Sequence, residues 1–113
     1  LPFIALGLMS SDNDEIRSRS LSPDGGREVQ IVIRDRAVGL IGGARFFVLR
    51  MRQTGDWSLR GWQDFAYVTA ADPDRLRFAT EWTNERRLAI VIEGEAKVSP
   101  HPPTVMGIAV IVR

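Results

Sequence analysis

Side chains that could carry acid–base or metal chemistry are few in this chain, and they lie in turns. The only histidine, His101, stands between Pro100 and Pro102, and the sequence contains no cysteine. A general base has to be positioned by packing and by a second polar partner, which a proline-rich link does not supply. Asp72 and Asp74 flank a turn proline, and this structural role is sufficient to explain them. We therefore expect no catalytic residue, no metal site and no bound cofactor.

Arginine and tryptophan form a more informative set. Every basic residue except Lys97 is arginine. Arginine and tryptophan are over-represented among the residues that dominate binding energy at protein interfaces. The alternative is a solvated, salt-bridged face with tryptophan rings that cap the core. The candidate partner-binding residues are Arg50, Arg52, Trp57, Arg60, Trp62, Arg75 and Arg77.

The charge balance limits the kind of partner. The formal net charge is only +1, whereas a nucleic-acid-binding domain is expected to be strongly basic. We expect no nucleic-acid partner. The first functional hypothesis is a non-enzymatic module that binds another protein, for example an immunity or inhibitor protein against a secreted toxin.

Two further hypotheses remain open. A curled sheet could carry a small apolar ligand among its aromatic side chains, although such residues are more often ordinary core. The residues of this carrier hypothesis are Phe46, Phe47, Phe65, Tyr67, Phe78 and Trp82. The third hypothesis is a hydrolase that uses carboxylates in loops.

Turn residues separate short runs rich in β-branched and aromatic residues, and no long segment has a 3.6-residue period. SPDGG at residues 22–26 predicts a turn, and Val29, Ile31 and Ile33 then alternate with other residues as in a strand. The clearest alternation is Arg75–Trp82, where Leu76, Phe78, Thr80 and Trp82 share the face expected to point inward. The pattern predicts a mainly β domain, either one antiparallel curled sheet or a β-sandwich, with about six or seven strands. Only Leu1–Ser18 has room for a short helix.

The last run, Thr104–Arg113, is expected to be one strand. It is apolar over most of its length, so an exposed edge there would invite association. We expect it to be central or covered, with its edge as a place for homo-oligomer contact.

The N-terminal segment differs from the rest in composition. Leu1–Met9 is almost wholly apolar and too short to cross a membrane alone, and a polar, charged stretch follows it. Three interpretations are open: the remnant of a membrane anchor or signal, a packed element, or an exposed arm. We expect residues 1–18 to form this segment and its spacer, and residues 19–113 to form the β-domain.

The order of these signals resembles a family of small bacterial extracytoplasmic domains of unknown function. The matching residues are Ser22–Gly25, Gly42–Ala44, Trp82, Asn84 and Leu88–Ile92. In that family a membrane anchor or lipoprotein signal precedes the Ser-Pro-Asp-Gly turn. The resemblance implies a tethered domain in the periplasm or at the cell surface, with a cytoplasmic location as the alternative. The family has no assigned catalytic residues, so it implies none here.

Overall fold

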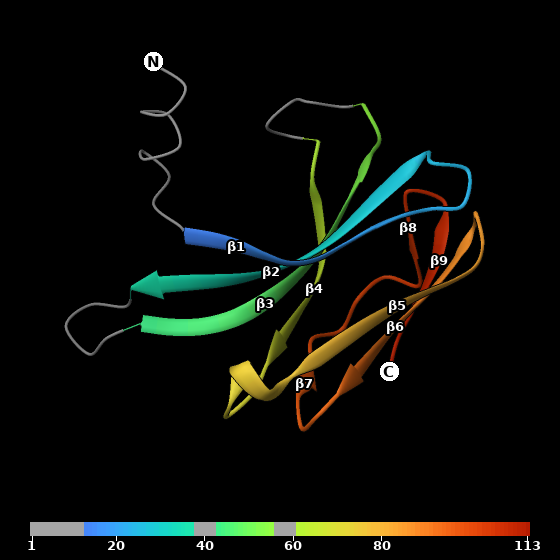
Figure 1. The fold of residues 1–113 in the computed structure, drawn as a ribbon. Helices are drawn as coiled ribbons and strands as arrows, with labels where there is room; N and C mark the ends of the chain where they lie inside the picture. Colours follow the sequence, from blue (N-terminus) through green and yellow to red (C-terminus); the bar gives the residue numbers. More distant parts are fainter. Residues whose placement is uncertain (1–12, 38–42, 56–60) are drawn as a thin grey trace, which may run out of the picture.

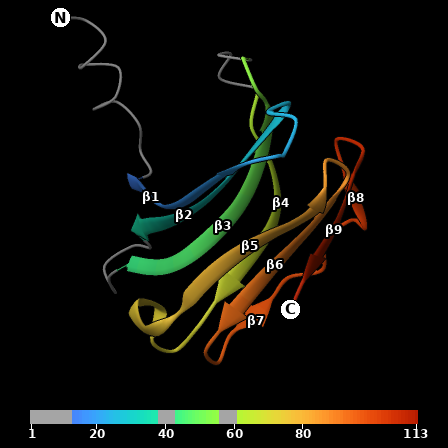
Figure 2. The ribbon, with the colours of Figure 1, turned by 45° about the vertical axis from the view of Figure 1, so that its right-hand side comes forward.

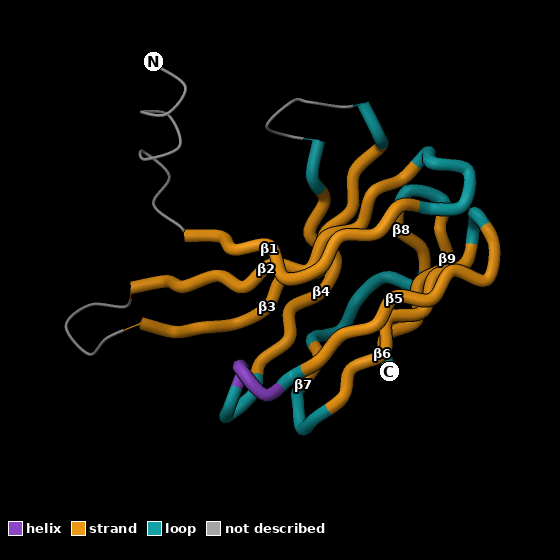
Figure 3. Tube along the Cα trace, in the orientation of Figure 1, coloured by secondary structure: helices purple, strands orange, loops and turns teal. Residues whose placement is uncertain are grey.

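The computed structural model describes residues 13–37, 43–55 and 61–113, and these form a β-sandwich of two sheets (Figure 1). The five-stranded sheet has the order β1 (Asn13–Leu21), β2 (Arg27–Ala37), β3 (Gly43–Gln53), β4 (Gln63–Thr69), β7 (Lys97–Val98). The four-stranded sheet has the order β5 (Arg77–Asn84), β6 (Arg87–Glu93), β9 (Ile108–Val112), β8 (Thr104–Val105). A 3-10 turn, η2 (Pro73–Arg75), precedes β5 and is purple in Figure 3. The predicted mainly β class is confirmed, and of its two forms the chain adopts the sandwich.

The strands β1 to β4 follow one another as antiparallel neighbours. β2 and β3 pair along their whole lengths, from Arg27 opposite Gln53 to Ala37 opposite Gly43. β7 adds only two residue pairs on the far side of β4. Figure 2 shows this sheet curving over the four-stranded one. β2 and β3 are therefore interior strands, which is consistent with their apolar residues on both faces.

One strand pair departs from the expected antiparallel order. β9 runs parallel to β6, with Ala109 opposite Arg87 and Val112 opposite Ile90. A parallel neighbour requires a connection that returns the chain to the end of the sheet where β6 begins. The segment from Gly94 to Pro103 makes this return, and it passes through β7 of the other sheet.

The inner faces of the two sheets form a single core. Alternate residues of β2 and β3 are buried on this side, as period-two alternation requires. The four-stranded sheet contributes buried residues from β6, β8 and β9. The least exposed members are Val29, Ile31, Leu49, Met51, Ala66, Val68, Ile90 and Val105. Phe78 and Trp82 of β5 are partly buried against the same cluster, which confirms the predicted inward face of that strand.

The turn between β1 and β2 has the predicted geometry. The amide of Gly25 donates to the carbonyl of Ser22 over 2.8 Å, and Gly25 has a φ of +74°. Pro23 occupies the second position, where its fixed φ suits the turn. The Ser22 hydroxyl donates to Asp24 over 2.6 Å and accepts from the amide of Arg27 over 3.0 Å. The hydrogen bond from Ser22 lowers the pKa of Asp24.

The first strand begins earlier than expected. β1 covers Asn13–Leu21, so residues expected to be a spacer belong to the sandwich, and no helix forms over residues 13–18. Its inward positions opposite β2 include Ser18 and Ser20. These small polar residues give no apolar alternation, which is why the sequence pattern did not reveal the strand. Leu1–Met9 lies outside the described residues.

The C-terminal run is also different from the expected single strand. A tight turn at Met106 and Gly107 divides it into β8 and β9, which pair through Val105 and Ile108. β9 lies between β6 and β8, so β8 takes the end position in the order of this sheet. The proposed homo-oligomer contact at this run would therefore involve β8, which has only two residues.

The turn after β6 requires glycine at position 94. Gly94 has a φ of +116°, and an added Cβ would lie 2.7 Å from Cδ2 of Leu76, a core residue. We expect Gly94→Ala to lower the free energy of unfolding by about 2–3 kcal/mol, because backbone strain and displacement of Leu76 add together. The matched control is Gly25→Ala, whose added Cβ meets no atom within 4 Å and should cost about 1 kcal/mol. Urea denaturation measures both, and equal losses would contradict a role for Leu76.

Candidate functional site

Within the part of the chain that the structure describes, no second layer covers the outer face of the five-stranded sheet (Figure 2). One apolar row crosses this face: Ile16 is opposite Val32, Val32 is opposite Val48, and Val48 is opposite Tyr67. The chain neighbours of these residues in β2 and β3 face the core, so alternation places the row outside. Val32 and Val48 are fully buried, whereas Ile16 is 54% and Tyr67 43% exposed.

Beside this row lies an Arg–Trp cluster, which consists of Arg50, Arg52 and Trp62. The two arginines are two residues apart in β3 and therefore share the outer face. The Cζ atom of each lies 4.4 Å from the centroid of the Trp62 ring. This distance is well within the range of a cation–π interaction. The cluster is therefore ordered before any partner binds.

A buried carboxylate on the neighbouring strand fixes the position of the cluster. Glu28 of β2 is opposite Arg52 and only 2% exposed. Arg52 donates to its Oε1 over 2.9 and 3.0 Å, and Gln30 donates to its Oε2 over 3.1 Å. Arg19 of β1 pairs with the same Oε2. Gln30 in turn accepts from Arg50 over 2.7 Å, so one network fixes both arginines.

The network also sets the ionisation of Glu28. Burial alone would raise the pKa of this carboxyl group. Hydrogen bonds from Arg52, Gln30 and Arg19 outweigh burial, and the pKa of Glu28 lies below its ordinary value of 4.5. Glu28 is therefore charged near neutral pH, and its charge keeps the guanidinium groups in place.

Three of the seven predicted partner-binding residues come together: Arg50, Arg52 and Trp62. Two of the others, Trp57 and Arg60, lie outside the described residues. The remaining two, Arg75 and Arg77, do not join this cluster.

Arg75 and Arg77 belong to a different part of the sandwich. Arg75 ends η2 and pairs with Asp72 over 3.1 Å. Arg77 begins β5 in the four-stranded sheet, opposite Glu93. β3 and β5 lie in different sheets, because the chain crosses between the sheets at η2.

Sequence reasoning missed the polar residues that bind the two arginines of the cluster from the adjacent strand. Glu28 and Gln30 occupy alternate positions of β2, and Arg50 and Arg52 occupy alternate positions of β3. Two such polar pairs in consecutive strands are a usable signal, since opposite charges face each other across paired strands. Arg19 could not be found in this way, because β1 itself was not predicted as a strand.

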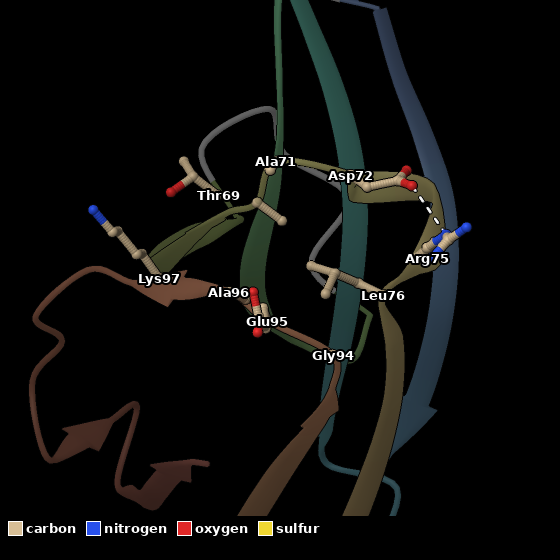
Figure 4. A pocket seen from close by; sticks show the side chains of 10 residues that line it. Thr69, Ala71, Asp72, Arg75, Leu76, Gly94, Glu95, Ala96 and Lys97 are labelled. Atoms are coloured by element: carbon tan, nitrogen blue, oxygen red, sulfur yellow. Dashed lines mark ion pairs between the residues drawn. The ribbon is translucent and has the colours of Figure 1, made fainter.

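A hollow lies where the turns between the sheets meet, and we call it the turn hollow (Figure 4). Its volume is about 980 Å³. Ten residues line it: Thr69, Ala70, Ala71, Asp72, Arg75, Leu76, Gly94, Glu95, Ala96 and Lys97. Figure 4 shows Asp72 and Arg75 directed toward each other at one rim and Lys97 at the opposite rim. The lining thus contains two cations and two carboxylates, with no excess of either sign.

The acidic residues considered for catalysis have structural partners in this region. Asp72 pairs with Arg75, while Asp74 pairs with Arg45 over 3.1 Å and with Arg17 over 3.5 Å. Asp72 is exposed, whereas a general acid that works near neutral pH needs a more protected site. His101 lies outside the hollow, with its Nδ1 2.8 Å from the carbonyl oxygen of Pro102.

The six aromatic residues of the carrier hypothesis are divided between two environments. Phe47, Phe65, Phe78 and Trp82 belong to the core or pack against it. Phe46 and Tyr67 lie on the outer face, with their ring centroids 6.1 Å apart. None of the six lines the turn hollow.

No protein-family model, curated protein or solved structure matches this chain. The resemblance to bacterial extracytoplasmic domains therefore stays a prediction. Within the described ranges, no helix is both long enough and apolar enough to span a membrane.

Proposed function

We propose that this protein is a non-enzymatic binding module whose outer face, on the five-stranded sheet, binds another protein. The observation that carries the proposal is the stacking of Arg50 and Arg52 on Trp62, on a face that no described element covers. Tryptophan, tyrosine and arginine are the residue types most enriched at the centres of protein interfaces.

The exposed apolar residues of this face support the same proposal. Ile16, Leu21 and Tyr67 are 54%, 48% and 43% exposed, and they flank the network on β1 and β4. Leu21 is opposite Glu28, which places it on the outer side. A partner would bury apolar area against these side chains, and the ordered charged centre between them would orient it.

The charges of this face favour an acidic partner. Its described charged side chains include four arginines and two carboxylates: Arg19, Arg34, Arg50, Arg52, Glu28 and Asp64. The guanidinium groups of this face are complementary to a partner surface that presents carboxylates around an apolar centre. Because the network already fixes Arg50 and Arg52, their ordering costs little free energy on binding.

The location that we propose is extracytoplasmic, with Leu1–Met9 as the link to a membrane. The resemblance around Ser22–Gly25 and the apolar N-terminal composition support it. An immunity or inhibitor protein is the concrete version of this role, because such a protein would bind the acidic face of a secreted toxin.

The proposal predicts that crosslinking depends on the outer face. Replacing Tyr67 with a photo-crosslinking phenylalanine derivative in the full-length protein should yield one dominant protein adduct in cells. The same probe at Ile111, which is 59% exposed on the other sheet, should yield none. Combining the Tyr67 probe with Trp62→Ala should weaken binding of the captured partner by about 30-fold, the size typical of an interface centre.

A further variant separates binding from folding. Arg50→Lys keeps the charge but loses the planar stacking group, so it should also weaken binding while leaving thermal unfolding nearly unchanged. Equal adducts from Tyr67 and Ile111, or an adduct that Trp62→Ala and Arg50→Lys leave unaffected, would refute the proposed surface.

A further inference from the structure

A second hollow lies between β1 and β5, the end strands of the two sheets, and we call it the edge slot. Its volume is about 330 Å³, and it is lined by Arg17, Ser18, Phe47, Leu76, Arg77 and Phe78. A hydrogen bond of 2.9 Å from the Trp82 indole to the Ser20 hydroxyl joins the two strands beyond the slot. The size is within the lower range of small-molecule sites.

A bulge in β1 supplies one wall of the slot. Ile16 is opposite Val32 and Ser18 is opposite Ile31, so Arg17 is an extra residue without a partner in β2. Ser18 therefore faces inward, and both Arg17 and Ser18 line the slot. A regular strand would direct two consecutive side chains to opposite faces, whereas a bulge redirects one of them. The irregularity thus brings a guanidinium and a hydroxyl group to the same place.

The rim of the slot is cationic. Arg77 makes no ion pair with any carboxylate of the described residues, including Glu93 opposite it. Arg17 lies 3.5 Å from Asp74, whereas Arg45 holds the same carboxylate over 3.1 Å. Charge-assisted hydrogen bonds of guanidinium groups are usually shorter than 3 Å. Arg17 also lies 3.9 Å from Glu15, so both of its carboxylate contacts are long, and two arginines with no lining carboxylate face the same opening.

The deeper wall is apolar. Phe47 of β3 and Phe78 of β5 meet there, with their ring centroids 4.7 Å apart and their planes at 59°. Phe47 is 2% and Leu76 is 9% exposed. A ligand that enters between the arginines would place its apolar part on these rings and its charged part at the rim.

We propose that the edge slot binds a small organic anion, namely a monocarboxylate with a short apolar tail. A guanidinium group matches a carboxylate through paired hydrogen bonds, and the aromatic wall accepts the tail. The turn hollow is larger, but its lining has two cations and two carboxylates, so it would not favour an anionic ligand over a cationic one. The edge slot lies between the sheets rather than on the outer face, so the proposal is independent of the protein-binding function.

Titration of the isotope-labelled full-length protein tests the site directly. At neutral pH and millimolar concentration, hexanoate should shift the amide resonances of Ser18, Arg77 and Phe78. 1-Hexanol lacks the charge and acetate lacks the tail, so each should bind at least about tenfold more weakly. Absence of hexanoate shifts at the slot, or equal binding of hexanoate and 1-hexanol, would overturn the proposal.

Two variants are expected to change the affinity for hexanoate in opposite directions. Arg77→Gln should weaken hexanoate binding by about tenfold, because a charge-assisted contact is lost. Asp74→Asn should strengthen binding by about threefold, because it removes the nearer of the two carboxylates that compete for Arg17. Arg87→Gln is the matched control, an exposed arginine of β6 outside the slot, and it should change affinity less than twofold. Equal effects of Arg77→Gln and Arg87→Gln would also overturn the proposal.

Discussion

Phe47→Ala is expected to lower the free energy of unfolding by about 3–5 kcal/mol, the range for truncation of a buried aromatic side chain. Phe47 is 2% exposed and packs on Phe78 across the two sheets. It is opposite Ile33 on one side and Val68 on the other, both of which are core residues. Truncation therefore opens a cavity at the point where the sheets meet. Urea denaturation followed by circular dichroism measures the change.

The matched control is the preceding residue. Phe46→Ala removes the same atoms from the same strand, but Phe46 lies on the outer face, where its main described contact is the edge of Tyr67. We expect a loss of about 1 kcal/mol there, the size of an aromatic pair. If Phe47→Ala does not fold, Phe47→Leu should still be less stable than Phe46→Leu. Equal losses at the two positions would contradict the assignment of the inner and outer faces.

This contrast between neighbours also shows what alternation in the sequence predicts. In β2, Val29, Ile31 and Ile33 were expected to share a face, and all three are in the core. The same rule correctly gave the inward face of β5. It succeeds because a side chain period of two is a local property of extended backbone.

Elements without apolar alternation were not predictable in this way. β1 has inward serines, and its position depends on pairing with β2 and on the Trp82–Ser20 hydrogen bond. The division of the last run at Met106 and Gly107 was hidden by continuous apolar residues. The parallel pairing of β9 with β6 depends on the path of the chain between sheets, which local periodicity does not specify.

The candidate site shows the same limit. The sequence predicts that Arg50 and Arg52 share a face, because they are two residues apart in one strand. It does not predict that Trp62, which precedes β4, reaches both of them. Nor does it separate Arg77 from them, because that requires knowledge of which sheet β5 joins.

Glu28→Gln is expected to lower the free energy of unfolding by about 3 kcal/mol at neutral pH, because it removes the buried carboxylate charge that pairs with the nearly buried guanidinium group of Arg52. Glu28 is 2% exposed and the Arg52 side chain 13% exposed, so water replaces little of the lost interaction. The matched control is Glu85→Gln, an exposed position in the turn between β5 and β6. It should change stability by less than about 0.5 kcal/mol. Trp62 fluorescence should also change in Glu28→Gln, because Arg52 loses its anchor.

The dependence on pH distinguishes lost charge from lost packing. The pKa of Glu28 is lowered in the folded state, so the unfolded chain takes up its proton first as the pH falls. The stabilisation is therefore fully present above the ordinary value of 4.5 and is lost as the pH falls through the lower folded value. The pKa of Asp24 is also lowered. Because Glu28→Gln leaves Asp24 in place, the contribution of Asp24 cancels in the difference between the two proteins. The stability difference between the wild type and Glu28→Gln should thus narrow in acid, and a difference that stays constant with pH would show that shape, not charge, holds the network.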